Sequence, residues 1–178
     1  MHPHTKNLLP RVYIPDEMSA PADDADRGTM VARWYAECGP RLYRYAVMLL
    51  ANGTDAEDVL QQVFATAMAD PRVAPAQPEA YLRTAVRNAA YSLLRQRRTT
   101  RAAAARILQP VASGCSPAEQ AALEQALRLL PPEQREVIHL HVYEGMTFQE
   151  VARATGESIN TVAGRYRYAL ARLRRTLS

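Results

Sequence analysis

The sequence predicts an all-α protein in which a flexible linker joins two small helical domains. Three observations support this prediction. Apolar residues recur three and four positions apart along most of the chain, which is the period of an amphipathic helix. Helix-start signals precede several of these runs, and glycines or prolines follow them. A length of 178 residues suits one medium domain or two small ones, and the apolar period is lost over residues 102–114.

The N-terminal part of the chain is predicted to be a tail followed by a helix. Residues 1–26 hold four prolines and an acidic cluster without an apolar period, so we expect a flexible tail there. Helical spacing then runs over residues 29–51 and is interrupted only by Gly39-Pro40. This pattern predicts either one kinked helix or two short helices.

Two further helices are predicted to complete a first domain over residues 27–100. Thr54-Asp55-Ala56-Glu57 has the pattern of a capping box. The apolar stripe after it reaches Met68, so this helix is expected to bury one face along its whole length. A proline-rich loop over residues 70–77 then leads into a long helix over residues 78–98.

A linker over residues 101–115 is expected to separate this domain from a second domain over residues 116–178. Ser116-Pro117-Ala118-Glu119 is another capping box, with proline at the first helical position, where its missing N–H is tolerated. The apolar pattern predicts a further helix over residues 133–144, with Leu140 to Val142 among its apolar residues and Gly145 after its end.

The C-terminal part has the pattern of a helix-turn-helix. Thr147-Phe148-Gln149-Glu150 is a third capping box and starts a helix of barely two turns that ends at Gly156. Ser158 can cap the longer helix that follows. The inward-facing residues of that final helix are predicted to be Ile159, Val162, Tyr166, Ala169, Leu170 and Leu173. In this motif the second helix lies in the major groove of DNA.

The other face of the final helix has the chemistry to read DNA. From Ile159 to the end of the chain there are five arginines and no acid. Asparagine can bond to adenine, arginine can contact guanine or phosphate, and the small Ala163 and Gly164 permit close approach. The predicted DNA-reading residues are Ser158, Asn160, Thr161, Ala163, Arg165 and Arg167. A plain helical hairpin with a solvated arginine face is the alternative interpretation.

Two more helix faces carry a distinctive charge. The helix over residues 78–98 places cations and one aromatic ring on one side, which suits phosphates and an unpaired base but equally a solvated basic helix. This side holds Arg87, Tyr91, Arg95 and Arg98. The helix that starts near Thr54 has an acidic and amide face, made of Asp55, Glu57, Asp58, Gln61 and Gln62. Because such a face repels phosphates, we expect it to dock a basic protein, although two of the acids could simply complement the helix N-terminus.

Composition and missing motifs exclude several classes of function. Lys6 is the only lysine among 22 basic residues, and the net charge is +4, so arginine dominates and favours recognition of phosphates or carboxylates. No phosphate-binding glycine motif, nucleophile elbow or Cys/His cluster occurs, so we expect no enzyme, no cofactor and no metal. His139 and His141 are predicted to be ordinary surface or half-buried side chains. Without a signal peptide or a run of roughly 20 apolar residues, we expect a cytoplasmic protein with no membrane insertion.

Five motifs follow one another along the chain. They are residues 54–64 (TDAEDVLQQVF), 81–88 (YLRTAVRN, followed by Leu93-Leu94-Arg95), 130–135 (LPPEQR), 145–152 (GMTFQEVA) and 160–165 (NTVAGR). In this order they resemble the extracytoplasmic-function (ECF) class of bacterial RNA polymerase sigma factors. The resemblance covers residues 29–177, and this collinearity is more specific than any single motif.

The resemblance implies two helical domains, sigma region 2 and region 4, that bind RNA polymerase core and direct it to promoters. It implies that the acidic face docks on the clamp helices of the largest polymerase subunit. Another set of residues matches the segment that opens and reads the downstream, minus-ten promoter element as a single strand: Arg83, Arg87, Asn88, Tyr91 and Arg95. The loop over residues 70–77 corresponds to the loop that holds a flipped-out base, and the final helix to the reader of the upstream, minus-thirty-five element. The family also implies an anti-sigma factor as antagonist.

Some positions depart from the family pattern. Tyr81 and Met68 stand where tryptophan is usual or frequent, and Ser92 stands where aspartate is common. Ala163-Gly164 replaces the usual lysine-serine before the arginine of the recognition helix. Glycine within a helix costs roughly 1 kcal/mol relative to alanine. The promoter sequence therefore does not transfer from the family to this chain.

The sequence as a whole predicts an alternative sigma factor, a non-enzymatic subunit for transcription initiation. One alternative is an autonomous helix-turn-helix transcriptional regulator with an N-terminal dimerisation domain, which would bind a symmetric operator tightly without polymerase. Another is an interaction protein that occupies polymerase without opening DNA. For that protein, removal of Arg87 and Arg95 would leave transcription unaffected.

Overall fold

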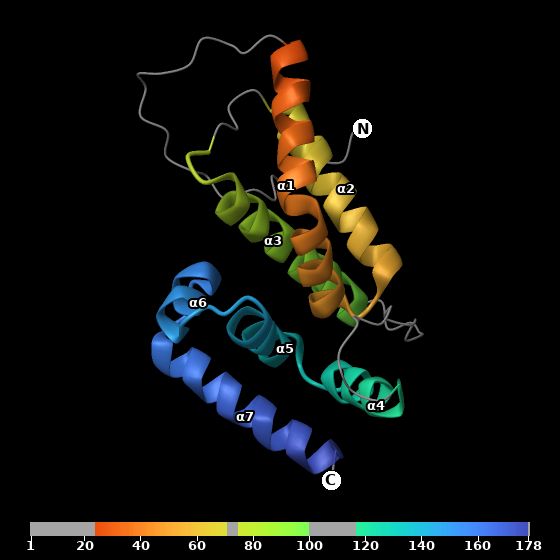
Figure 1. The fold of residues 1–178 in the computed structure, drawn as a ribbon, viewed down its shortest axis with the longest axis vertical. Helices are drawn as coiled ribbons and strands as arrows, with labels where there is room; N and C mark the ends of the chain where they lie inside the picture. Colours follow the sequence, from red (N-terminus) through yellow and green to blue (C-terminus); the bar gives the residue numbers. More distant parts are fainter. Residues whose placement is uncertain (1–23, 71–74, 100–116, 178) are drawn as a thin grey trace. The chain divides into compact units, whose positions relative to one another are not determined.

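The computed structural model describes residues 24–70, 75–99 and 117–177, and every regular element in these ranges is a helix (Figure 1). The all-α prediction is therefore confirmed. The first helix begins at Asp24, so the predicted tail is too long by its last three residues. The rest of the tail, part of the proline-rich loop and the linker lie outside the described residues.

The chain separates into two compact units. The first unit draws on residues 1–46 and 57–101, and the second draws on residues 47–56 and 102–178. The sequence predicted a single boundary within residues 101–115. It did not predict that residues 47–56 would be grouped with the second unit.

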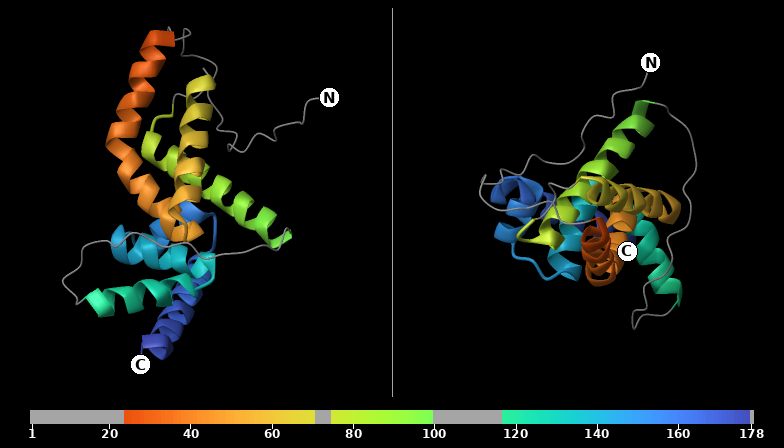
Figure 2. Two further views of the ribbon diagram at one scale, coloured as in Figure 1. Left: turned by 90° about the vertical axis from the view of Figure 1, so that its right-hand side faces the viewer. Right: turned by 90° about the horizontal axis from the view of Figure 1, so that it is seen from above.

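In the described ranges, the first unit is built from α1 (Asp24–Leu50), α2 (Gly53–Ala69) and α3 (Pro78–Thr99), apart from the end of α1 and the start of α2, which fall within residues 47–56. Helix α1 continues through Pro40 and bends along its length (Figure 2), so the kinked-helix alternative is the one observed. Trp34 before the proline is 3% exposed, and Leu42 and Tyr45 after it are 2% and 3% exposed. Burial of both halves offsets the roughly 3 kcal/mol that a proline costs inside a helix.

Helix α1 contacts both other helices of this unit. Tyr35 meets Phe64 of α2 edge-on, with ring centroids 5.1 Å apart. Arg41 forms an ion pair with Glu79 of α3 at 3.1 Å. Met68, predicted to be the last buried residue of the α2 stripe, is 42% exposed. The buried stripe therefore ends one residue early, at Ala67, which is 1% exposed, and an arginine caps the carbonyl groups at this end of α2.

That arginine is Arg27 of α1, which is 4% exposed. Its Nε donates to the carbonyl oxygen of Met68 at 2.8 Å, and its Nη2 donates to the carbonyl oxygens of Ala67, at 2.6 Å, and Asp70. The last carbonyls of a helix have no partner within the helix, and the negative end of the helix dipole attracts a cation. Arg27 thus fastens the start of α1 to the end of α2.

The start of α2 differs from the prediction. The Oδ1 of Asn52 accepts hydrogen bonds from the N–H groups of Thr54, at 3.0 Å, and Asp55, at 3.3 Å. The predicted capping box at Thr54-Asp55-Ala56-Glu57 is therefore wrong, and Asn52 is the cap. Ala51 adopts a left-handed backbone with φ of 54°, which turns the chain between α1 and α2.

The described part of the second unit consists of four α-helices and one widened turn. Its elements are α4 (Pro117–Arg128), α5 (Pro132–Ile138), η1 (His139–Tyr143), α6 (Phe148–Thr155) and α7 (Ile159–Leu177). Helix α7 packs against α4, α5 and α6. One core cluster consists of Ala126, Leu127, Leu130, Ile138, Ala169 and Leu173. Ile159 was predicted to face inward but is 49% exposed, because it is the first residue of α7 and precedes the packed part of the helix.

The helix predicted over residues 133–144 consists of two elements. After α5 the chain forms the π-turn η1, in which the N–H of Glu144 donates to the carbonyl oxygen of His139 at 3.1 Å. This i→i−5 bond adds a residue to the turn. In this turn His139 and Leu140 are buried, whereas Val142 is 56% exposed.

The two histidines of η1 have different partners. His139 is 4% exposed, so the expected surface or half-buried side chain is wrong for it, and its Nε2 lies 3.5 Å from Oε1 of Glu144. His141 is half-buried, with its Nδ1 2.7 Å from the carbonyl oxygen of Met146. Because a carbonyl only accepts, Nδ1 of His141 carries the hydrogen. Among the described residues, no group of three or more His, Cys, Asp or Glu side chains could hold a metal ion.

We predict that Arg27→Ala lowers the free energy of unfolding by about 1–3 kcal/mol, because it leaves buried carbonyl oxygens without their donor. Urea denaturation followed by circular dichroism measures this change. Arg33→Ala is the matched control, since Arg33 lies on the same helix in an exposed ion pair with Glu37 at 3.9 Å. It should change stability by less than about 0.5 kcal/mol. Equal effects of the two substitutions would contradict the capping role.

Candidate functional site

The acidic face predicted on α2 is exposed in four of its five members. Glu57, Asp58, Gln61 and Gln62 all lie on the solvent side of the helix. Asp55 does not, because its side chain is 8% exposed and it precedes the buried Val59 by one helical turn. The open surface of this helix is therefore two carboxylates and two amides. It can donate and accept hydrogen bonds and carries negative charge.

The basic face of α3 has an ion-paired arginine near its start and an exposed arginine near its end. Near the start of α3, Glu79 accepts from Nη2 of Arg83 at 2.8 Å and also pairs with Arg41. Near its end, Arg95 is exposed. The positive charge that a ligand can reach therefore increases toward the carboxyl end of α3.

Between these ends lies a cation–aromatic pair. The Cζ of Arg87 is 4.8 Å from the centroid of the Tyr91 ring, and both side chains are half-buried, as is Asn88. Stacking against the guanidinium restricts the ring and keeps the cation beside it. The pair thus combines a phosphate-binding group with a flat surface on which a base can stack. The side chain of Arg98 lies outside the described part of α3.

A capping box positions α6, as predicted. The side-chain oxygen of Thr147 accepts from the N–H of Glu150 at 3.3 Å, and Oε2 of Glu150 accepts from the N–H of Thr147 at 2.8 Å. These hydrogen bonds, first the one from the backbone of Thr147, lower the pKa of Glu150 below its ordinary value of 4.5. The carboxylate form is therefore the one that stabilises this helix start.

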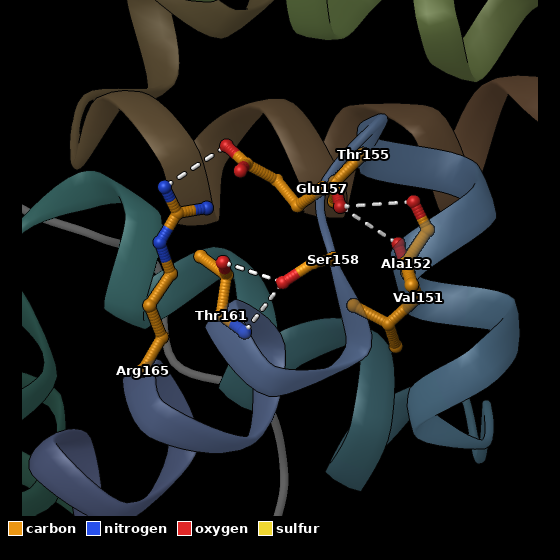
Figure 3. A network of polar contacts seen from close by, with 7 residues as sticks. All are labelled: Val151, Ala152, Thr155, Glu157, Ser158, Thr161 and Arg165. Atoms are coloured by element: carbon orange, nitrogen blue, oxygen red, sulfur yellow. Dashed lines mark hydrogen bonds and ion pairs between the residues drawn. The ribbon is translucent and has the colours of Figure 1, made fainter.

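The turn between α6 and α7 is fixed at each of its three residues; Figure 3 shows Glu157 and Ser158 of this turn. Gly156 ends α6 in the left-handed region with φ of 72°. The N–H of Glu157 donates to the carbonyl oxygen of Ala152 at 3.1 Å. Ser158 caps α7, since its Oγ accepts from the N–H of Thr161 at 3.0 Å, which confirms the predicted cap. This closed turn is what places the start of α7 at one orientation to α6.

The predicted DNA-reading residues at and after the start of α7 fall into two groups by exposure. The exposed ones are Ser158, Asn160 and Arg167, and the half-buried ones are Thr161, Ala163 and Arg165. Ser158 and Thr161 bond to each other, with their hydroxyl oxygens 2.8 Å apart. Their hydroxyl groups are therefore already hydrogen-bonded within the helix cap.

Arg165 is held by the turn. Its Nη2 lies 2.9 Å from Oε1 of Glu157, and the two side chains are 24% and 32% exposed (Figure 3). One of the arginines predicted to contact DNA is therefore paired within the helix-turn-helix itself.

Gly164 faces open space on the same helix. A Cβ built at this position would meet nothing within 4 Å. Packing inside the described structure therefore does not require glycine here. The observation fits the prediction that this part of α7 lets a partner approach closely.

The two carboxylates that pair with arginines of the basic helices, Glu79 and Glu157, were not among the residues predicted from the sequence. Glu79 and Arg83 are four residues apart on one helix, a spacing that predicts an ion pair, so this signal was available. Glu157 and Arg165 are eight residues apart across a turn, and no local rule pairs them. Arg27 was likewise missed, because its partners lie about 40 residues away.

Comparisons with known proteins agree with this geometry. The family model of Sigma-70 region 2 matches residues 34–100, and that of Sigma-70 region 4 matches residues 120–173. The RNA polymerase sigma-E factor of Streptomyces coelicolor is 32% identical over 144 residues, which cover 76% of this chain and 79% of that protein. The chain belongs to the ECF class of RNA polymerase sigma factors. Transcription initiation and DNA binding are thus confirmed as its class of function, which in this family is regulatory and not enzymatic.

Further relatives of this ECF sigma factor are similar over most of their length. The ECF RNA polymerase sigma factor SigL of Mycobacterium tuberculosis is 31% identical over 162 residues, or 86% of this chain and 92% of that protein. The sigma factor RpoE of Bartonella quintana, solved in complex with the anti-sigma factor NepR, has a TM-score of 0.69 and 26% identity, covering 84% of this chain and 97% of that one. CnrH, solved in complex with the cytosolic domain of CnrY, has a TM-score of 0.56 and 29% identity over 88% and 90% of the two chains.

Within the described residues of this ECF sigma factor, no helix is both long enough and apolar enough to cross a bilayer.

We predict that Gly164→Ala raises the free energy of unfolding by about 0.5–1 kcal/mol, because alanine restricts the unfolded chain and meets nothing in the folded one. Gly156→Ala is the matched comparison, since its Cβ would also meet nothing within 4 Å but its φ is +72°. This second substitution should destabilise the protein, because alanine is strained in the left-handed region. Denaturant titrations measure both. A loss of stability in Gly164→Ala would contradict the open environment of this position.

Proposed function

We propose that this ECF sigma factor binds the RNA polymerase core and directs promoter recognition, DNA opening and transcription initiation in the cytoplasm. The observation that supports this most is the distribution of charge: α2 exposes an acidic and amide face, while α3 and α7 expose arginines. An acidic face repels DNA, and a recognition helix has no use on a protein that binds only polymerase. The combination suits a subunit that contacts polymerase and promoter together.

The acidic face is the proposed docking surface for the clamp helices of the largest polymerase subunit. Glu57, Asp58, Gln61 and Gln62 are exposed along α2 and can pair with basic side chains of a partner. Asp55 also belongs to the family's docking segment, but its exposure of 8% gives it little surface to offer. We therefore assign the direct contacts to the four exposed residues and leave Asp55 a role in the first turn of α2.

Helix α3 is the proposed reader of the downstream, minus-ten element. Tyr91 offers a ring on which an unpaired base can stack, and Arg87 beside it can neutralise a phosphate. Arg95 extends the cationic surface, and Asn88 adds a side-chain amide that can bond to a base. Arg83, whose charge is matched by a carboxylate, supports this surface from the amino end of the helix.

Helix α7 is the proposed reader of the upstream, minus-thirty-five element in the major groove. Asn160 can bond to adenine, and Arg167 can bond to guanine or to a phosphate. Ser158 and Thr161 fix the start of the helix, which the groove-facing end needs, and Ala163 leaves room for the DNA. Each DNA-facing surface gives modest affinity alone, so polymerase is needed to hold both on one promoter.

We extend the proposal to an antagonist. RpoE of Bartonella quintana and CnrH are each in complex with a further protein, which for RpoE is the anti-sigma factor NepR. The likeness in fold supports control of this chain by an anti-sigma factor of its own.

We predict that Glu57→Ala/Asp58→Ala weakens binding to purified core polymerase about tenfold or more, which corresponds to about 1.4 kcal/mol. Fluorescence anisotropy of the labelled full chain measures the affinity, and run-off transcription measures the consequence. Asp26→Ala/Glu37→Ala removes two exposed acids of α1 and should leave both readouts unchanged. An equal loss in the two variants would contradict a specific docking face.

We predict that Arg87→Ala/Arg95→Ala leaves core binding unchanged but lowers promoter opening and run-off product about tenfold or more. Permanganate reactivity of unpaired thymines measures the opening. Arg33→Ala/Arg44→Ala removes two exposed arginines of α1 and serves as the control.

Two results would overturn the proposed function. Transcription unaffected by loss of Arg87 and Arg95 would favour a protein that occupies polymerase without opening DNA. Absence of polymerase-directed initiation by the wild type, with tight binding of the lone protein to a palindrome, would favour an autonomous regulator.

A further inference from the structure

The turn of the helix-turn-helix contains the acidic residue Glu157, whose backbone position is fixed by its neighbours on both sides. Glu157 follows the left-handed Gly156 and precedes the helix cap Ser158, and its own N–H is bonded to the carbonyl oxygen of Ala152 at 3.1 Å. Its carboxylate is therefore presented at a fixed position beside the first turns of α7. There it lies 2.9 Å from Nη2 of Arg165 (Figure 3).

We propose that Glu157 is a specificity-determining residue for duplex recognition by α7. By pairing with Arg165, it neutralises that guanidinium and holds it against the turn, so that Arg165 is withheld from DNA phosphates. The inference rests on the proposed function, because it assigns a role to Glu157 within the same reading helix.

The arginines of α7 are thereby made unequal. Arg167 is two residues further along, is exposed, and forms no ion pair with any residue that the structure describes. Arg165 is three-quarters buried and has a carboxylate partner. A cation that contacts phosphate adds affinity for any DNA sequence, because it releases counterions irrespective of the bases. When one such cation is withheld from DNA, Asn160 and Arg167 contribute a larger fraction of the binding free energy.

The pair carries no net charge, because one carboxylate lies against one guanidinium. Glu157 thus disfavours non-specific complexes by occupying an arginine that would otherwise attract the phosphate backbone.

The test uses the full chain and measures affinity for two duplexes at several salt concentrations. One duplex is selected by the wild type from a random library, and the other is unrelated. In Glu157→Gln, we expect affinity for the unrelated duplex to rise about 3- to 10-fold, and the slope of log K against log salt concentration to steepen by about 0.9, the value for one added phosphate contact. The preference for the selected duplex should fall.

Two further variants separate this role from a structural one. In an Arg165→Ala background, Glu157→Gln should have less effect on the slope, since the arginine it would release is absent. Glu124→Gln removes an acid that pairs with Arg128 at 3.8 Å on α4 of the same unit, and it should leave slope and preference unchanged. Thermal unfolding shows whether each variant is folded. Glu157→Asp is the conservative replacement, since it keeps the carboxylate.

Some outcomes would overturn the proposal. They are an unchanged slope and preference in folded Glu157→Gln, an equal change in the Arg165→Ala background, or an equal change in Glu124→Gln. Failure of the proposed function is seen separately, because it would abolish polymerase-directed run-off transcription by the wild type while leaving the duplex-binding comparison intact.

Discussion

The closed turn at residues 156–158 is the constraint on which the arrangement of α6 and α7 in the second unit depends. Gly156 lets the chain leave α6 with a left-handed backbone, and Ser158 starts α7 by accepting from the N–H of Thr161. Glu157, between them, bonds through its backbone to α6 and through its side chain to Arg165 of α7. Since these interactions occur within three consecutive residues, the relation of the two helices and the position of one arginine are determined together.

Ion pairs with carboxylates determine which arginines of this sigma factor a ligand can reach. A net charge of +4 says that cations are in excess but not which of them a ligand can reach. Glu79 engages Arg83 near the start of α3, and Glu157 engages Arg165 near the start of α7. Each basic helix therefore has an ion-paired arginine in its amino-terminal half and exposed arginines beyond it. This arrangement concentrates the available cations instead of spreading them along the helix.

Three residues that depart from the family pattern lie in different environments in the structure. Gly164 lies in open space on α7, so its lack of a side chain widens the approach to that helix. Met68 lies exposed at the end of α2, beside the carbonyls that Arg27 covers. Tyr81 is half-buried, and burial raises the pKa of its hydroxyl, with Asp70 acting in the same direction and Arg27 opposing both. The first of these sites lies on a proposed DNA-facing helix, which is where promoter preference would differ between members of the class.

Local interactions are what the sequence determined by itself. The helical class, the capping box of α6 and the Ser158 cap depend on residues within four positions of one another, and apolar spacing or cap chemistry specifies them directly. The order of the motifs that identifies the family is likewise read directly from the sequence. The exposed acidic face of α2 also follows from helical spacing, apart from Asp55.

Other features were decided only by the tertiary structure. Arg27 reaches carbonyls about 40 residues away, and α1 continues through Pro40 because both of its halves are buried. The π-turn of η1 places His139 inside, and the Glu157–Arg165 pair bridges a turn. Each of these depends on which surfaces meet once the helices pack. A periodic pattern gives the face of a helix that is buried, but not the partner it meets or the arginine that a distant carboxylate will hold.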